Sequence, residues 1–397
     1  MSKMGIYEKL GVRTVIHAAG THTRLGGTIM PLEVLDAMRE ASRSLVAIDE
    51  LQAAAGKIIA EITGAESGIV TAGASAALTL ATAACVTGMD PDKMNRLPDT
   101  TGMKNNVVIQ KSHRDGYDHA IRAVGVKLVE VGMPYRTYPY EVEAAINENT
   151  AAVAYVVTRS RGSLSLEKVV EIAHSSGVPV IVDAAGELPP AENLRRFIAA
   201  GADLVVFSGG KAIRGPQSSG ILCGRRDLIM AAAMQNLDMD VHPETWKPPE
   251  EFIDLDRMSG PPEHGIGRGF KVGKEDIVGL ITALRLYVEK DHEAEYRSWL
   301  RKIEWIVKEL DQLNHVKARA ALPQESGMGF PLAYITVDQE ALGIDCFQVS
   351  RALKAGEPSI HVREGMMHEG TLGIHPINLQ DGDETVIVKR FKEILNK

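Results

Sequence analysis

The chain has 397 residues, of which 45% are hydrophobic, 24% charged and 5% aromatic, and this composition excludes a disordered chain. Lysine and arginine number 44 against 52 for aspartate and glutamate, so the formal net charge is −8. This balance gives no electrostatic footprint for nucleic acid or an anionic membrane. We therefore expect a small-molecule substrate and further copies of the chain as partners, with neither nucleic acid nor a membrane among them.

Three features of the sequence indicate where in the cell the protein is found. The cysteines, Cys85, Cys223 and Cys346, lie far apart and form no CxxC or Cys/His pattern, so we expect no disulfide framework and no metal site. The N-terminal residues lack the apolar core and cleavage site of a secretory signal. Residues 69–88 carry no charge but are mostly Ala, Thr and Gly, which predicts a buried strand, turn and helix rather than a membrane span. A cytoplasmic protein fits best.

Short β-branched runs alternate with helical patterns through the middle of the chain. The runs are apolar along most of their length, as strands are in a sheet that is covered on both faces. Segments between them, such as 166–177, carry apolar residues at helical spacing and end in glycine. The pattern predicts an α/β class with a mostly parallel sheet. The predicted strands are 107–110, 126–131, 152–157, 178–183 and 203–208.

The rest of the chain predicts further parts. A Pro-rich, aperiodic stretch covers 233–269, and a periodic stretch over 274–313 predicts one long helix. Short strands such as 332–337 and a closing helix over 386–395 then predict a small α+β domain. The predicted organisation is an N-terminal segment over 1–30 that packs on the core or on a neighbouring subunit, a large domain over 31–272, a connecting helix over 273–313 and a small C-terminal domain over 314–397.

Two ionisable residues follow neighbouring strands of the predicted sheet. Asp183 ends the strand 178–183, and Lys211 lies in the Gly-rich turn after the strand 203–208. Because α/β proteins build their sites at the carboxyl edge of the sheet, we expect both side chains at that edge. Taken singly, a helix-capping aspartate and a solvated lysine are the simpler interpretations. Together they fit pyridoxal phosphate, whose aldehyde bonds to a lysine and whose ring nitrogen stays protonated beside a carboxylate.

The phosphate of such a cofactor needs hydrogen-bond donors. A predicted strand, turn and helix over 69–81 would aim backbone N–H groups and the helix dipole at an anion, although an ordinary capped turn is the alternative. A serine three residues before the lysine adds a hydroxyl, and a histidine after the strand 107–110 is a candidate ring to stack on the cofactor. The predicted residues are Gly73, Ala74, Ser75, Ser208 and His113.

Four segments carry a resemblance to known enzymes: VIHAAGTHTRLGG at 15–27, VDAAGELPP at 182–190, FSGGKAIRGPQSSGILCGR at 207–225 and GRGFKVGKED at 267–276. They resemble the selenocysteine synthase-like group of fold-type I pyridoxal-phosphate enzymes. The resemblance implies a large domain with a mostly parallel sheet and a smaller α+β domain. It implies Lys211 as the Schiff-base lysine, Asp183 as the partner of the pyridinium nitrogen, the turn at 73–75 as the phosphate site and His113 as the stacking residue.

The same resemblance implies a homodimer or larger homo-oligomer with sites at the subunit interface. The segment around Arg268 would then reach a neighbour's cofactor. A substrate with a carboxylate and a phosphate needs cations, and guanidinium groups bind both bidentately. We expect the substrate-binding residues to be Arg24, Arg159 and Arg363.

Within this group the D-glucosaminate-6-phosphate ammonia-lyase branch fits better than the tRNA-modifying branch. The chain begins almost at the catalytic-core pattern, and its sequence shows no clustered cations for tRNA phosphates. We predict a lyase that abstracts an α-proton, eliminates a β-hydroxyl as water and releases ammonia to give a 2-keto-3-deoxy acid. An amino-acid racemase, an aldolase for β-hydroxy amino acids and a sulfur or selenium transferase stay open, because one cofactor serves all of these reactions.

Overall fold

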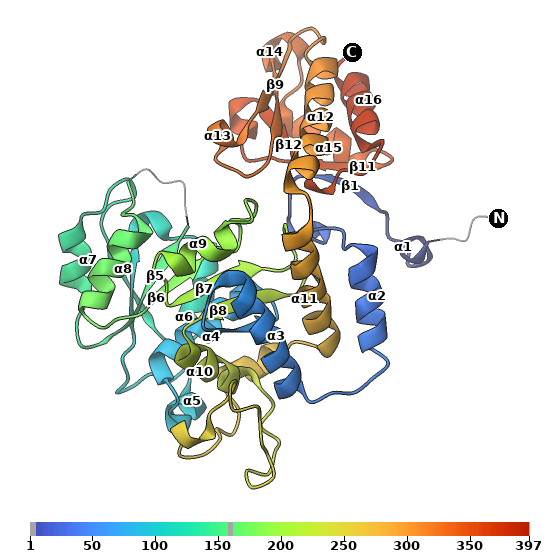
Figure 1. Ribbon diagram of the computed structural model, residues 1–397. Coiled ribbons are helices and arrows are strands. Elements are labelled where there is room, and N and C mark those ends of the chain that lie inside the picture. The colour runs from blue at the N-terminus through green and yellow to red at the C-terminus, as the bar shows by residue number, and fades with distance from the viewer. Residues whose placement is uncertain (1–4, 158–161, 397) are drawn as a thin grey trace. The chain divides into compact units, whose positions relative to one another are not determined.

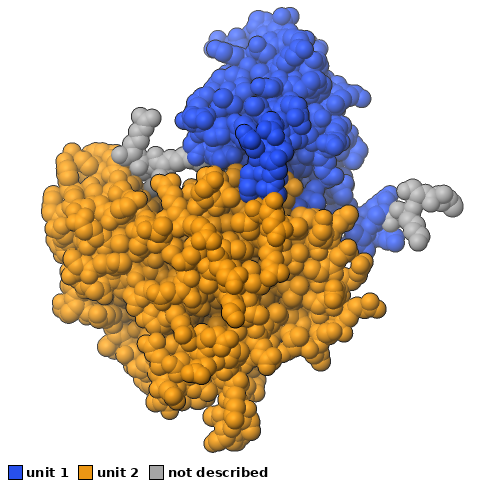
Figure 2. All heavy atoms as spheres, viewed as in Figure 1, with its two compact units in different colours: residues 1–29, 290–397 blue, residues 30–289 orange. Residues whose placement is uncertain are grey.

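A computed structural model describes residues 5–157 and 162–396, which fall into two compact units (Figures 1 and 2). Unit 1 comprises residues 1–29 and 290–397, and unit 2 comprises residues 30–289. The N-terminal segment belongs to unit 1 because strand β1 (Val15–Ala18) pairs in parallel with β11 (Ser359–Val362). The sequence predicted that segment as a separate part, since nothing local in it indicates a partner some 340 residues away along the chain.

Unit 2 is built on a seven-stranded sheet in the order β2-β8-β7-β6-β5-β3-β4. Strands β3 to β7 pair in parallel, whereas β8 runs antiparallel to both β7 and β2. The prediction of an α/β class with a mostly parallel sheet is confirmed, and each predicted strand lies within two residues of an observed one. The strands are β2 (Ser67–Thr71), β3 (Asn106–Gln110), β4 (Lys127–Val131), β5 (Thr150–Val156), β6 (Val180–Asp183), β7 (Leu204–Ser208) and β8 (Gly220–Gly224).

Helices cover both faces of this sheet, which is why its strands are apolar throughout. Successive strand residues point to opposite faces. On one face Val206 of β7 packs in the same cluster as Leu80 of α4. On the other face the neighbouring Phe207 contacts Phe197 of α9, with 6.2 Å between ring centroids. The helices of unit 2 are α2 (Leu32–Ala41), α3 (Ile48–Thr63), α4 (Ala74–Thr87), α5 (Pro91–Arg96), α6 (His119–Arg122), α7 (Pro139–Ala145), α8 (Leu166–Ser175), α9 (Asn193–Ala199), α10 (Arg226–Asn236) and α11 (Lys274–Glu289).

The uncharged residues 69–88 form the end of β2, a turn and α4, as the sequence predicted. Nearly every residue of α4 from Ala76 to Thr87 is buried, since the helix lies between the sheet and α10. Its alanines allow this close approach from several sides. In the described ranges, no helix has both the length and the apolar character needed to span a membrane.

After α10, residues 237–273 form only short 3₁₀ turns, so the predicted irregular stretch is present but begins after residue 236 rather than at 233. This segment is anchored at several points. Phe252 and Ile253 are buried, and the Trp246 indole N–H donates to the Asp49 carboxylate at 2.9 Å. The loop is therefore ordered by packing and hydrogen bonds rather than by helix or strand formation.

Unit 1 is a small α+β unit, as predicted for the C-terminal part of the chain. Its antiparallel sheet has the order β12-β10-β9, and the helices α12 and α15 pack near it. The single helix predicted over 273–313 is wrong: Asp291 caps a new helix by accepting from the Ala294 N–H at 2.8 Å. The elements are α1 (Ile6–Lys9), α12 (His292–Leu310), β9 (Val316–Ala321), α13 (Pro323–Ser326), β10 (Leu332–Val337), α14 (Gln339–Leu342), α15 (Cys346–Ala355), β12 (Thr371–Ile374) and α16 (Asp383–Leu395).

Candidate active site

Asp183 and Lys211 meet at one edge of the unit 2 sheet. Asp183 is the last residue of β6 and lies in register with Val206 of the parallel strand β7. β7 ends two residues later at Ser208, and the turn that follows carries Lys211. A Cβ atom on Gly186 would lie 3.8 Å from the Lys211 Nζ, so the chain leaving β6 passes alongside the lysine side chain.

The two groups are partly buried and perturb each other's ionisation. Burial raises the pKa of Asp183, while the Ala185 N–H, which donates to its Oδ1 at 3.0 Å, and the Lys211 charge oppose the rise. Burial lowers the pKa of Lys211, against the pull of Asp183 and Glu187. The lysine amine is therefore closer to its neutral, nucleophilic form at pH 7 than an exposed lysine is.

His113 ends the 3₁₀ turn Lys111–His113 after β3, and its ring is buried. The Val156 N–H donates to its Nδ1 at 3.3 Å, which assigns the ring proton to Nε2. Burial lowers the pKa of His113 to about 4, so the imidazole is neutral at pH 7. The rings of His113 and Tyr155 form a T-shaped contact with 4.6 Å between centroids, and the buried Nε2 has no hydrogen-bond partner among the described residues.

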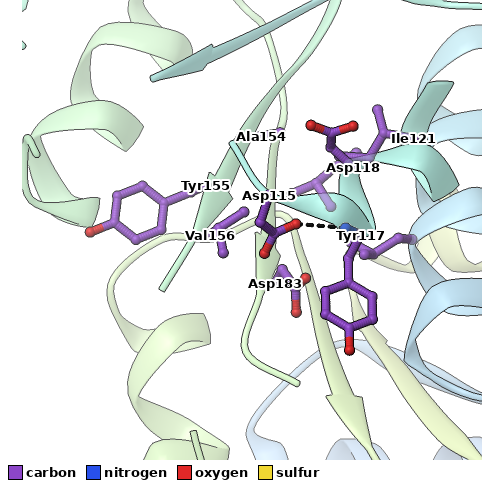
Figure 3. Close-up of a pocket in the computed structure, with 10 residues that line it drawn as sticks. Asp115, Tyr117, Asp118, Ile121, Ala154, Tyr155, Val156 and Asp183 are labelled. Carbon is purple, nitrogen blue, oxygen red and sulfur yellow. Dashed lines mark hydrogen bonds between the residues drawn. The ribbon is translucent and has the colours of Figure 1, made fainter. Parts of the chain in front are cut away.

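A pocket at this sheet edge brings in residues that the sequence interpretation missed. Figure 3 shows the carboxylates of Asp115 and Asp183 next to each other, with the Tyr117 ring beside them. The Tyr117 N–H donates to Asp115 at 2.8 Å, and the Asp115 charge adds to the rise in the pKa of Asp183. The sequence could have pointed to Asp115 and Tyr117 only through their position next to His113 in the segment SHRDGYDHA. The pocket is lined by Leu78, Asp115, Tyr117, Asp118, Ile121, Ala154, Tyr155, Val156, Ile181 and Asp183.

The predicted phosphate turn has the geometry of a helix N-terminus on a tight loop. Gly73 has φ +108°, a conformation that side-chain-bearing residues rarely adopt, and α4 begins at Ala74. The first intrahelical bond at this end joins the Ala77 N–H to the Gly73 carbonyl at 3.0 Å. The N–H groups of Ala74, Ser75 and Ala76 therefore have no intrahelical acceptor and remain for an anion.

Ser208 lies close to this turn through the sheet register. Gly220 of β8 pairs with Ser208 on one side and with Thr71 of β2 on the other. A Cβ atom on Gly220 would fall 2.6 Å from the carbonyl carbon of Gly73, so only glycine lets the turn lie against β8. The two predicted sources of phosphate donors, the turn and the serine, are thus held one strand apart.

Replacing Gly220 by alanine is expected to destabilise unit 2 and to weaken cofactor binding. The new methyl group forces the Gly73 turn away from β8, and such overpacking costs about 1–3 kcal/mol. Chemical denaturation and a cofactor titration would measure both effects. The matched control is Gly269→Ala, since a Cβ there meets nothing within 4 Å. Equal stability and equal cofactor affinity for the two variants would contradict the prediction that the turn at 73–75 binds the cofactor phosphate.

The predicted arginines that the structure describes fall in both units. Arg268 forms an ion pair with Asp238 at 2.7 Å, inside unit 2. Arg24 and Arg363 belong to unit 1, where Arg24 lies 3.8 Å from the Glu364 carboxylate. Arg159 lies outside the described residues. Their roles toward substrate or a neighbouring cofactor stay predictions.

Residues 15–240 match the family model for L-seryl-tRNA selenium transferase. The chain belongs to this selenium transferase family. The chain is 35% identical to a 5'-C-glycyluridine monooxygenase-decarboxylase of Streptomyces sp over 98% of this chain and 92% of that protein. It is 32% identical to the D-glucosaminate-6-phosphate ammonia lyase of Salmonella typhimurium (strain 14028s / SGSC 2262) over 98% of this chain and 97% of that protein.

Comparison with solved structures shows which fold the chain has. A D-glucosaminate-6-phosphate ammonia-lyase structure superposes with a TM-score of 0.82 at 31% identity, covering 100% of this chain and 99% of that one. An aspartate aminotransferase from Thermus thermophilus gives a TM-score of 0.52 at 17% identity, covering 98% of this chain and 94% of that one, which shows a shared fold alone. The architecture is that of the fold-type I pyridoxal-phosphate enzymes. The residues matched by the selenium transferase model include Asp183, Lys211 and the turn at 73–75.

Proposed function

We propose that the chain is a pyridoxal-phosphate-dependent lyase acting on an amino acid or aminosugar acid, with D-glucosaminate 6-phosphate as the first candidate. The substrate would lose an α-proton and its β-hydroxyl, and hydrolysis would then release ammonia and leave a 2-keto-3-deoxy acid. One observation carries the proposal: a partly buried lysine and a partly buried carboxylate share the sheet edge of a chain that resembles an ammonia-lyase over nearly its full length.

The described residues fit the cofactor. Lys211 supplies an amine for its aldehyde, and Asp183 supplies a carboxylate for its ring nitrogen. The turn at 73–75 and Ser208 supply donors for its phosphate. The buried N–H at Nε2 of His113, which has no partner among the described residues, fits a ring that lies against a polar ligand. Burial disfavours the charged form of Asp183 in spite of the Lys211 charge, and a protonated pyridine would stabilise that charged form further.

When bound, the cofactor supplies an electron sink for the charge that develops at the substrate Cα. The residues of the chain supply the proton transfers. The Lys211 amine, whose pKa burial lowers, is suited to accept the α-proton. The Asp183 carboxylate holds a proton at the ring nitrogen and so keeps the sink in its electron-withdrawing form. The neutral His113 ring would stack on the cofactor ring without adding a charge to the site.

Sulfur transfer through a protein persulfide needs a cysteine that readily ionises. Burial raises the pKa of Cys223 to about 12 and that of Cys346 to about 11, and it raises the pKa of Cys85 as well. These three are all the cysteines in the sequence. The lyase proposal is therefore better supported than sulfur transfer. A racemase or an aldolase would use the same lysine and carboxylate, and product analysis separates them.

A second candidate function is the oxidative decarboxylation of an amino acid. The similarity to the 5'-C-glycyluridine monooxygenase-decarboxylase favours it, because that relative also aligns over nearly the whole chain.

We further propose that the protein is cytoplasmic, is a homodimer or larger homo-oligomer with sites at the subunit interface, and binds no nucleic acid. Light scattering on the purified protein would measure the subunit number.

Incubation with D-glucosaminate 6-phosphate tests the lyase proposal. We expect ammonia and a 2-keto acid in equal amounts, with no oxygen consumed. Unphosphorylated D-glucosaminate in a parallel reaction reports whether the phosphate is recognised. Exchange of the α-proton in deuterated water without ammonia release would point to a racemase. Oxygen uptake with release of carbon dioxide would point to the second candidate, and either result would contradict the lyase.

A further inference from the structure

A second carboxylate lies beside that of Asp183 at the edge of the unit 2 sheet. Figure 3 shows the Asp115 carboxylate next to the Asp183 carboxylate, and both residues line the same pocket. They come from different parts of the chain, because Asp183 ends β6 whereas Asp115 follows β3 and the 3₁₀ turn Lys111–His113. The proposed proton transfers use Asp183 but leave Asp115 without a role.

The turn that carries Asp115 is held by the buried carboxylate of Asp118. Asp118 accepts from the Arg114 Nε at 2.5 Å and from the Arg122 Nε at 2.9 Å. The Tyr117 N–H donates to the Asp115 Oδ1 at 2.8 Å and so fixes the direction of this carboxylate. The fold therefore sets the position of the Asp115 charge, although the residue is exposed.

The arginines of this turn are paired with carboxylates other than that of Asp115. Arg114 precedes Asp115 in the sequence, but its Nε donates to Asp118 and its Nη1 donates to Glu130. Arg122 forms its ion pair with the other oxygen of Asp118. These two guanidinium groups are therefore already engaged.

Asp115 acts on Asp183 through its charge. The Asp115 carboxylate adds to the rise in the pKa of Asp183, and Lys211 opposes that rise. Burial lowers the pKa of His113 to about 4 and raises the pKa of Tyr155, so both of these rings are neutral at pH 7. Two neighbouring carboxylates repel each other, and a cation beside them is attracted to both. The titratable groups that line the pocket or act on Asp183 are Asp115, Tyr117, Asp118, Tyr155 and Lys211.

We infer that Asp115 is a positioning residue for the cofactor, whose charge acts together with that of Asp183 to hold the proton on the ring nitrogen of pyridoxal phosphate. The inference rests on the proposed function and adds to it a second carboxylate at the cationic end of the ring. Removal of the Asp115 charge would make the protonated ring nitrogen less stable. Because Asp115 is exposed, solvent and salt screen its charge, so the effect is smaller than that of Asp183.

Asp115→Asn tests the inference, because it removes the charge and keeps the hydrogen bond. The amide oxygen can still accept from the Tyr117 N–H, so the turn should keep its shape. NMR of the protein loaded with pyridoxal phosphate that is isotopically labelled at the ring nitrogen reports the protonation of that atom without substrate or turnover. We expect the ring nitrogen in the variant to lose its proton at a pH roughly half a unit lower than in the wild type. Loss of the proton at the same pH in both proteins, or a nitrogen that stays protonated in both wherever they are folded, would overturn the inference.

Two further variants and added salt separate an effect of charge from an effect of structure. Asp115→Glu keeps the charge, so its ring nitrogen should titrate closer to that of the wild type than the ring nitrogen of Asp115→Asn does. The control is Asp92→Asn, which removes the same charge from an exposed residue of unit 2 that pairs with Arg96. It should leave the titration unchanged. Salt at about 1 M should reduce the difference between Asp115→Asn and the wild type. An equal shift in Asp92→Asn, or a difference that salt does not reduce, would overturn the inference.

The wild-type protein in the same experiment tests the proposed function separately. A wild type that does not bind pyridoxal phosphate would overturn the proposed function and this inference together. A wild type that binds the cofactor with a protonated ring nitrogen, beside an Asp115→Asn protein that titrates identically, would overturn this inference alone.

Discussion

Replacing Lys211 by alanine is expected to abolish turnover and to remove the visible absorbance of the protein-bound cofactor. Lys211 both bonds the cofactor and moves the α-proton. General base catalysis alone provides on the order of 10²–10⁴-fold, so kcat should fall by at least that factor. Spectra and initial rates on the purified variant measure the two effects separately.

The matched control for this variant is Lys104→Ala, a lysine that is exposed and lies away from the pocket. It should keep the wild-type spectrum and rate. Because burial lowers the pKa of Lys211, the cofactor-free Lys211→Ala protein should be no less stable than the wild type. A Lys211→Ala protein that keeps both its absorbance and its turnover would contradict the assignment of this lysine.

Replacing Asp183 by asparagine is expected to lower kcat on the order of 10²–10⁴-fold while the protein stays folded. The amide keeps the shape of the side chain but cannot hold a proton at the ring nitrogen, so the electron sink weakens. The Ala185 N–H can still donate to the amide oxygen, as it does to Oδ1 now. Rates should fall much more than cofactor affinity, which a titration with pyridoxal phosphate would measure.

Asp183→Asn is expected to lower kcat without lowering the stability of the cofactor-free protein. The folded pKa of Asp183 is raised above its unfolded value of about 3.9. Its contribution to stability is therefore present below pH 3.9 or so and is lost as the pH rises through the folded pKa. At pH 7 the cofactor-free Asp183→Asn protein should melt at the same temperature as the wild type or higher. A variant that melts lower but turns over normally would assign Asp183 a structural role only.

The strands of the large sheet could be predicted because they are buried on both faces. Val180 to Asp183 and Leu204 to Ser208 read as short apolar runs for that reason, and their parallel order placed Asp183 and Lys211 at one edge. The break before α12 could not be seen from hydrophobic spacing, since both helices keep an apolar stripe across it. It depends on the capping side chain of Asp291, which is a short polar signal inside a periodic segment.

Contacts between distant segments were beyond the reach of local patterns. The pairing of β1 with β11 moves the N-terminal segment into unit 1, and no periodicity in either strand encodes the partner. Asp115 and Tyr117 reach the pocket from an exposed turn that has no hydrophobic period. The close approach of Gly220 to Gly73 could not be predicted either. A glycine in a sequence indicates that a side chain does not fit at that position, but it does not indicate which segment lies against it.

The central claim is that Lys211 is the residue that bonds pyridoxal phosphate, and reductive trapping tests it most directly. Borohydride treatment of the cofactor-loaded protein converts the carbon–nitrogen bond to the bound lysine into a stable secondary amine, and peptide mass mapping then locates it. The account predicts a single modified peptide with the cofactor on Lys211. A modification on another lysine, or none after loading, would contradict it.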